Sequence, residues 1–179
     1  VHETRVVFGS RVKINDVEIN YEVNGTGEPL VLIHGLGASL KMWFRQIPTF
    51  SRHYKTIAYD CRGHGDSEKP KKQYSLKDLA DDLKGLLDKL GIEKAHILGL
   101  SMGTIIAQVF AINYQNRIKT LILAGVASAP TFREETTPAT KAIEQMFTGA
   151  METRENFDMN EFMLTLARYA FSEGVNEEL

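Results

Sequence analysis

A serine between two glycines is the first feature of this sequence that could carry out chemistry. The run Gly99-Leu100-Ser101-Met102-Gly103 lies between a segment with the pattern of a strand (95–100) and one with the pattern of a helix (102–114). A sharp turn from strand to helix strains its central residue and lifts that side chain clear of the sheet, and only small residues fit beside it. We therefore predict that Ser101 is an exposed nucleophile above the positive end of a helix dipole. The simpler alternative is an incidental serine in a glycine-rich turn.

A second glycine-rich run could stabilise negative charge. His34-Gly35-Leu36-Gly37 follows a short continuous apolar segment, residues 29–33. Acyl transfer places negative charge on a carbonyl oxygen, and preorganised backbone N–H groups are the usual means of stabilising it. The Met102 N–H directly follows the candidate nucleophile, and the Leu36 N–H is exposed by the glycines on either side. Alone, the run 34–37 would be a tight turn without a catalytic role, and only its pairing with Ser101 favours an oxyanion site.

The groups that would activate Ser101 are missing from the sequence. A serine nucleophile needs a general base, normally a histidine that a carboxylate orients. The family resemblance described below implies that the acid and then the histidine follow the serine along the chain. That order disfavours His64 as a displaced base, and the carboxylates after Ser101 have the pattern of a solvated face. We therefore expect the acid and the base to lie outside this chain. All five histidines precede Ser101: His2, His34, His53, His64 and His96.

Alternating strand and helix patterns must position these residues. Residues 11–23 alternate apolar and polar side chains, as two strands joined by a turn at Asn15-Asp16 would. A clear helix begins after Ser75 and ends at Gly91. Ser75 and Asp78 have the spacing of a capping box at its start. Strand and helix patterns alternate from residue 29 to residue 126, which predicts a parallel sheet with right-handed crossovers. The remaining predicted strands are 29–33, 54–59, 95–100 and 119–126. Two further helices are predicted, one at 40–50 that Pro48 disturbs and a buried one at 102–114.

Composition excludes several classes of protein. The 179 residues are 43% hydrophobic and 25% charged, which is the globular average and excludes a disordered or fibrous chain. A net charge of −2 without basic clusters argues against nucleic acid or an anionic membrane as the main partner. No segment has the ~20 continuous apolar residues of a membrane span. The single cysteine and the lack of a secretory signal favour a cytoplasmic protein. We expect no cofactor and no metal, because no phosphate-binding loop or ligand spacing is present.

Three motifs in this order resemble the α/β-hydrolase superfamily, and its small esterases and lactonases in particular. They are residues 34–37, Asp60-x-Arg62-Gly63-His64-Gly65-x-Ser67, and residues 99–103. The resemblance covers about residues 11–127. It implies Ser101 as the nucleophile, Leu36 and Met102 as oxyanion donors, and structural roles for His34 and His64. Ser101 argues against the dehalogenase branch, whose members place an aspartate there.

The resemblance also implies a division of the chain into two parts. Residues 1–127 would be the amino-terminal part of an α/β-hydrolase core, with a mostly parallel sheet flanked by helices and incomplete at its C-terminal side. Residues 128–179, with helices expected near 136–147 and 160–171, resemble the start of the cap that roofs the substrate pocket.

Three functions follow as hypotheses. The first is a hydrolase that cleaves a small-molecule ester, thioester or lactone. Sequence beyond Leu179 or another chain would complete its triad, so the expected partner is a complementing C-terminal segment or a second copy in a homo-oligomer. The second is a ligand-binding or interaction protein without a working triad. The third, an esterase-fold lyase or peroxidase, would use the same nucleophile. The sequence does not specify the substrate.

Overall fold

A computed structural model describes residues 7–125 of the chain. The chain divides into two compact units, Val1–Ser128 and Ala129–Leu179, and every described residue belongs to the first. The partial cap predicted at 128–179, with its two helices, lies outside the described residues.

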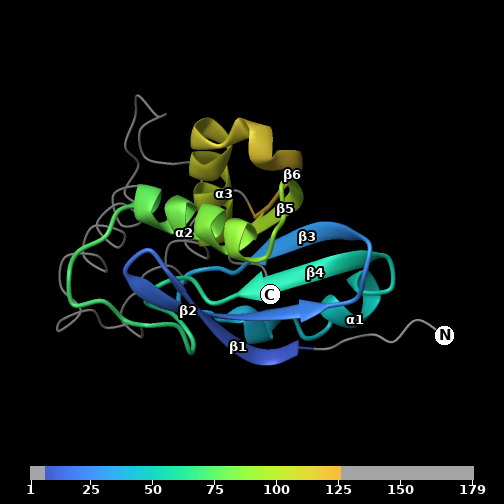
Figure 1. The fold of residues 1–179 in the computed structure, drawn as a ribbon, viewed down its shortest axis with the longest axis horizontal. Helices are drawn as coiled ribbons and strands as arrows, with labels where there is room; N and C mark the ends of the chain where they lie inside the picture. Colours follow the sequence, from blue (N-terminus) through green and yellow to red (C-terminus); the bar gives the residue numbers. More distant parts are fainter. Residues whose placement is uncertain (1–6, 126–179) are drawn as a thin grey trace, which may run out of the picture. The chain divides into compact units, whose positions relative to one another are not determined.

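Six strands form one sheet, in the order β1-β2-β4-β3-β5-β6 (Figure 1). The two strands at one edge, β1 and β2, are antiparallel to each other, and β2 is antiparallel to β4. All pairings among β4, β3, β5 and β6 are parallel. The predicted mostly parallel α/β sheet is therefore confirmed. The strands are β1 (Val7–Ile14), β2 (Val17–Asn24), β3 (Glu28–Ile33), β4 (Tyr54–Tyr59), β5 (Ala95–Leu100) and β6 (Ile118–Ala124).

Two long helices, α2 (Leu76–Lys89) and α3 (Met102–Asn113), pack against each other beside the sheet (Figure 1). The predicted capping box begins α2: the Ser75 hydroxyl accepts from the Asp78 N–H, and the Asp78 carboxylate accepts from the Ser75 N–H. A Cβ atom at Gly85 would overlap the side chain of Ile14. Gly85 therefore lets α2 approach β1 closely.

The single helix predicted at 40–50 is wrong. The structure has a short 3₁₀ helix, η1 (Leu40–Trp43), followed by the four-residue helix α1 (Ile47–Phe50). Pro48 lies in the first turn of α1, where its missing N–H has no intrahelical role. Proline also donates no hydrogen bond to the preceding turn, and its ring crowds the carbonyl four residues earlier. One continuous helix therefore cannot form across Pro48.

The core lies on both faces of the central strands. Leu30 and Leu32 of β3 pack with Trp43 of η1 on one face. The alternate β3 residues, Val31 and Ile33, point to the opposite face and are also fully buried. Trp43 therefore takes the core role that aromatic residues on a sheet-covering helix usually take.

The far edge of the sheet is much more exposed. Leu121 and Ile122 of β6 are 37% and 45% exposed. Helix α3 corresponds to the buried helix predicted at 102–114, but its Ile112 is 70% exposed. The predicted burial holds for the first two turns of α3 and is wrong for its last turn.

Among the helices of residues 7–125, none has the length and apolar character that a membrane span requires.

Candidate active site

Ser101 lies at the turn between β5 and α3 and has an unusual backbone conformation. Its φ is +52° and its ψ −115°, and its side chain is exposed. A residue other than glycine in such a region costs about 1–3 kcal/mol and persists only where the surrounding structure imposes it. The Ser101 N–H donates to the carbonyl of Ala124 on β6 at 3.1 Å. Within residues 7–125 the Ser101 hydroxyl makes no hydrogen bond, so its oxygen is available to a ligand.

The two glycines around Ser101 are required by close backbone packing. A Cβ atom at Gly99 would overlap the carbonyl of Gly103. A Cβ atom at Gly103 would overlap the carbonyl of Ile33 at the end of β3. The turn therefore packs closely both within itself, between Gly99 and Gly103, and against the end of β3. This packing holds Ser101 in its strained conformation.

The same packing brings the second glycine-rich run beside Ser101. A Cβ atom at Gly35 would lie 3.5 Å from the Cβ of Ser101 and 4.0 Å from its Oγ. The next residue, Leu36, donates no backbone hydrogen bond within the described part of the chain. Gly37 follows with φ +68°, which glycine adopts without strain. The two motifs far apart in the sequence thus meet at the carboxyl ends of β3 and β5.

His34 determines how the peptide between Gly35 and Leu36 is oriented. Its Nε2 accepts the Cys61 N–H at 3.0 Å, so Nδ1 carries the proton and donates to the Gly35 carbonyl at 2.7 Å. Burial lowers the pKa of His34 to about 4, so the ring is neutral near pH 7. In a trans peptide the C=O and the following N–H point in opposite directions. Because the Gly35 carbonyl faces His34, the Leu36 N–H points away from it.

Met102 supplies the second free N–H group near Ser101. It is the first residue of α3, and the first N–H groups of a helix have no intrahelical acceptor. Ser101 occupies the N-cap position, but its side chain makes no capping hydrogen bond. The Met102 N–H therefore stays available at the positive end of the helix dipole.

The Asp60 loop after β4 supports the run 34–37. The Asp60 carboxylate accepts the N–H of Leu40 at 2.6 Å and that of Asp66 at 2.8 Å, and it also accepts the side-chain amide of Asn20 at 2.9 Å. A Cβ atom at Gly65 would overlap this carboxylate. Asp60 is therefore a buried anchor that joins the loop to β2 and to the start of η1. The motif from Asp60 to Ser67 was noticed in the sequence, but the anchoring role of its carboxylate was missed.

A buried ion pair attaches the same loop to α2. Arg62 donates two hydrogen bonds to Asp82, at 2.5 and 2.6 Å, and both side chains are at least 95% buried. Burial acts to lower the pKa of Arg62, but the hydrogen bond and charge of Asp82 outweigh it and raise that pKa. Sequence analysis missed Asp82. Its position three residues after Leu79 and four before Leu86 puts it on the buried stripe of α2, which is the signal that could have found it.

No hydrogen bond joins a histidine to Ser101 in the described part of the chain. Both ring nitrogens of His34 already have partners. His96, at the opposite end of β5, is held at 2.6 Å by Thr120 and at 2.8 Å by Glu28. The His64 Nδ1 lies 3.2 Å from the Arg62 carbonyl. Both ring nitrogens of His34 and of His96 are therefore occupied by other partners, so neither ring has a nitrogen that could accept a proton from Ser101.

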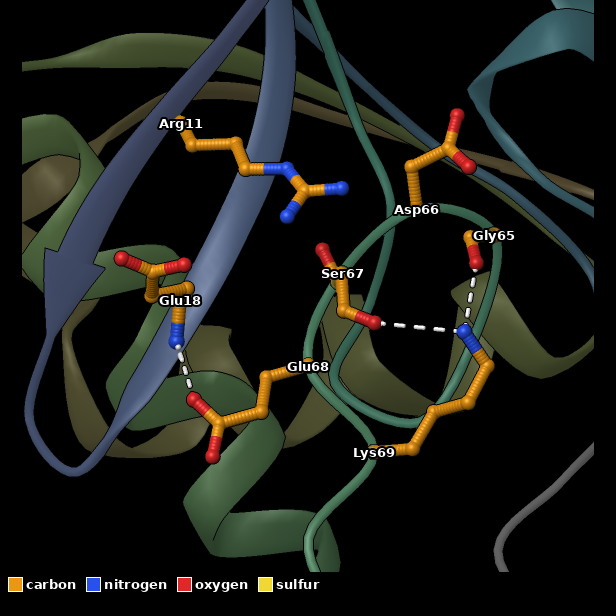
Figure 2. A pocket seen from close by; sticks show the side chains of 7 residues that line it. All are labelled: Arg11, Glu18, Gly65, Asp66, Ser67, Glu68 and Lys69. Carbon is orange, nitrogen blue, oxygen red and sulfur yellow. Dashed lines mark hydrogen bonds between the residues drawn. The ribbon is translucent and has the colours of Figure 1, made fainter.

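A polar pocket of about 320 Å³ lies elsewhere on the molecule (Figure 2). Lys69 donates to the carbonyls of Gly65 and Ser67, and the Glu68 carboxylate accepts the Glu18 N–H. These contacts hold the loop 65–69 in place, and the pocket contains none of Ser101, Leu36 or Met102. Among the described residues, no group of histidine, cysteine or carboxylate side chains could hold a metal ion.

The sequence was compared with known proteins, and residues 28–171 match the family described as alpha/beta hydrolase fold. The chain is 37% identical over 123 residues to 3-oxoadipate enol-lactonase 2 of Acinetobacter baylyi, covering 68% of this chain and 46% of that protein. It is 38% identical over 104 residues to a soluble epoxide hydrolase of Corynebacterium sp. strain C12, covering 58% and 36%. The chain thus spans less than half the length of these curated relatives.

Solved structures agree with the sequence comparison. A hydrolase from Pseudomonas aeruginosa superposes with a TM-score of 0.70 at 28% identity, covering 97% of this chain and 64% of that one. The family match covers well over half of the chain, and the four parallel strands β3 to β6, the turn at Ser101 and the adjoining glycine-rich run lie within it. The chain therefore belongs to the alpha/beta hydrolase fold family.

Proposed function

We propose that the protein is a serine hydrolase that cleaves a small carboxylic ester, thioester or lactone through an acyl-enzyme at Ser101. The observation that carries this proposal is the strained, exposed Ser101 at the turn between β5 and α3, with Gly35 packed beside it. Hydrolases predominate among the relatives, and one of them is an enol-lactonase.

The proposed reaction has two steps. The Ser101 Oγ attacks the substrate carbonyl carbon while the general base takes the hydroxyl proton, and the carbonyl oxygen becomes an oxyanion. The Leu36 and Met102 N–H groups donate to that oxyanion. The C–O or C–S bond to the leaving group then breaks, and the protonated base returns its proton to the leaving group. Water repeats the sequence on the acyl-enzyme, which releases the carboxylic acid and restores Ser101.

The identity of the nucleophile limits the class of substrate. Some relatives are named as epoxide hydrolases. A serine that opened an epoxide would form an ether, and water cannot cleave an ether by attack at an acyl carbon. A carboxylate nucleophile would instead form an ester, which water can hydrolyse. Ser101 therefore favours a substrate that reacts at a carbonyl carbon.

The acid and the base are proposed to come from sequence outside residues 1–179. No histidine follows Ser101 in the sequence, and the contacts of His34 and His96 occupy both of their ring nitrogens.

The test uses the full-length protein, a p-nitrophenyl ester and a fluorophosphonate probe. We expect one probe per chain, located on the peptide that contains Ser101 by mass spectrometry. We also expect Ser101→Ala to abolish both labelling and ester hydrolysis. Thr56→Val, a change in a buried residue on β4, serves as the matched control. Unchanged hydrolysis by Ser101→Ala would exclude the proposed nucleophile.

A further inference from the structure

Among the described residues, the carbonyl oxygen of Ser101 accepts two hydrogen bonds, and both come from Thr104. The Thr104 hydroxyl donates at 2.7 Å and the Thr104 N–H at 2.8 Å. Thr104 lies in the first turn of α3 and is fully buried. Its own carbonyl accepts the side-chain amide of Gln108 at 3.0 Å, which adds a second link to the helix.

The carbonyl that Thr104 holds belongs to the same peptide as the Met102 N–H. In a trans peptide these two groups are coplanar and point in opposite directions. Rotation of this peptide would therefore move the Met102 N–H by the same angle as the Ser101 carbonyl. Two donors from one rigid residue resist that rotation better than a single hydrogen bond does.

Serine or threonine hydroxyls in helices often bind a carbonyl three or four residues earlier, so the bond alone does not indicate a role. Two further observations do. The held carbonyl is that of Ser101, whose φ is +52° and whose side chain makes no capping hydrogen bond to the helix. The peptide of the other oxyanion donor is held in the same manner, because the Gly35 carbonyl accepts from His34 and from the Ala38 N–H at 3.2 Å.

We propose that Thr104 is a positioning residue, whose hydroxyl holds the Ser101–Met102 peptide so that the Met102 N–H points at the developing oxyanion. This inference rests on the proposed function of Ser101. Thr104 does not touch the substrate. It acts through the peptide, so its loss should weaken binding of the tetrahedral transition state more than binding of the planar substrate.

The test compares Thr104→Val, which removes the hydroxyl but keeps the shape, with Thr104→Ser, which keeps the hydroxyl. The matched control is Thr56→Val, because Thr56 is also fully buried and its hydroxyl donates to the Asn24 carbonyl at 2.8 Å. In the full-length protein, kcat and KM for a p-nitrophenyl ester are measured together with inhibition by an alkylboronic acid. The boronic acid forms a tetrahedral anionic adduct on Ser101, and the melting temperature reports folding.

We expect Thr104→Val to lower kcat by about 10-fold, since complete loss of an oxyanion donor costs ~10²–10³-fold. KM should change by less than about twofold, and the boronate inhibition constant should rise by the same factor as kcat falls. Thr104→Ser should restore both quantities. If Thr104→Val does not fold, Thr104→Ala replaces it with the same expected outcomes.

Two results would overturn the inference. One is a kcat and a boronate affinity for Thr104→Val equal to those of Thr56→Val. The other is a loss in Thr104→Ser as large as that in Thr104→Val. If Ser101→Ala is inactive in the same assay, these results reject only the role of Thr104. If Ser101→Ala remains active, the proposed function itself fails.

Discussion

His34 should make the stability of the protein depend on pH in a defined window. Its Nε2 accepts the Cys61 N–H, so protonation of that nitrogen breaks the hydrogen bond. Burial lowers the pKa from 6.5, its value in the unfolded chain, to about 4 in the folded protein. Between these values the unfolded state binds a proton that the folded state does not bind. The free energy of unfolding therefore falls as the pH falls from 6.5 toward 4.

The magnitude follows from the two pKa values. One pKa unit corresponds to about 1.4 kcal/mol, so the full window is worth about 3 kcal/mol, of which about 2 kcal/mol is lost between pH 7 and pH 4.5. Other groups titrate in this range as well. The quantity to measure is therefore the difference in unfolding free energy between the wild type and His34→Gln, in which those other contributions cancel.

The assay is urea unfolding followed by the fluorescence of Trp43, at pH 7 and at pH 4.5. His34→Gln should be less stable than the wild type at pH 7, and the difference should shrink by about 2 kcal/mol at pH 4.5. His53→Gln, at an exposed position, controls for the loss of one imidazole. An NMR titration of the His34 ring gives the pKa directly if His34→Gln does not fold. A stability difference that is independent of pH, or a titration near pH 6.5, would refute this account of the buried ring.

Three further predictions concern the scaffold. Gly99→Ala places a Cβ against the Gly103 carbonyl and should cost at least ~1–3 kcal/mol in urea unfolding; a neutral effect would contradict the close packing of the turn. Arg62→Met leaves the buried Asp82 carboxyl without its arginine partner, which should cost ~3–5 kcal/mol, and the double change Arg62→Met/Asp82→Leu should recover much of that loss. No recovery in the double variant would mean that the ion pair itself stabilises the fold. Because β6 is an exposed edge strand of the described sheet, we expect the 179-residue chain to self-associate through it, and we expect Ile122→Lys to elute as a smaller species in size-exclusion chromatography with little change in melting temperature. An unchanged elution volume would show that β6 is not the associating surface.

Sequence patterns located the strands well because their signals are local. The buried run of β3 and the strand of β5 were predicted to within a residue, and so was the capping box at Ser75. Each depends on hydrogen bonds or side-chain alternation among neighbouring residues. The single helix predicted at 40–50 did not form, because Pro48 interrupts the hydrogen bonds that a continuous helix needs.

The sequence by itself determined the type of sheet, the turn at Ser101 and the need for glycines around it, because strand-to-helix connection and steric crowding act over a few residues. Only the tertiary structure decided which distant groups meet there. Gly35 lies beside Ser101 because β3 and β5 are neighbours in the sheet, and Asp60 reaches Leu40 because β4 lies on the other side of β3. The partners of Arg62 depend likewise on how α2 packs. Such contacts follow from strand order and helix packing, to which the whole chain contributes.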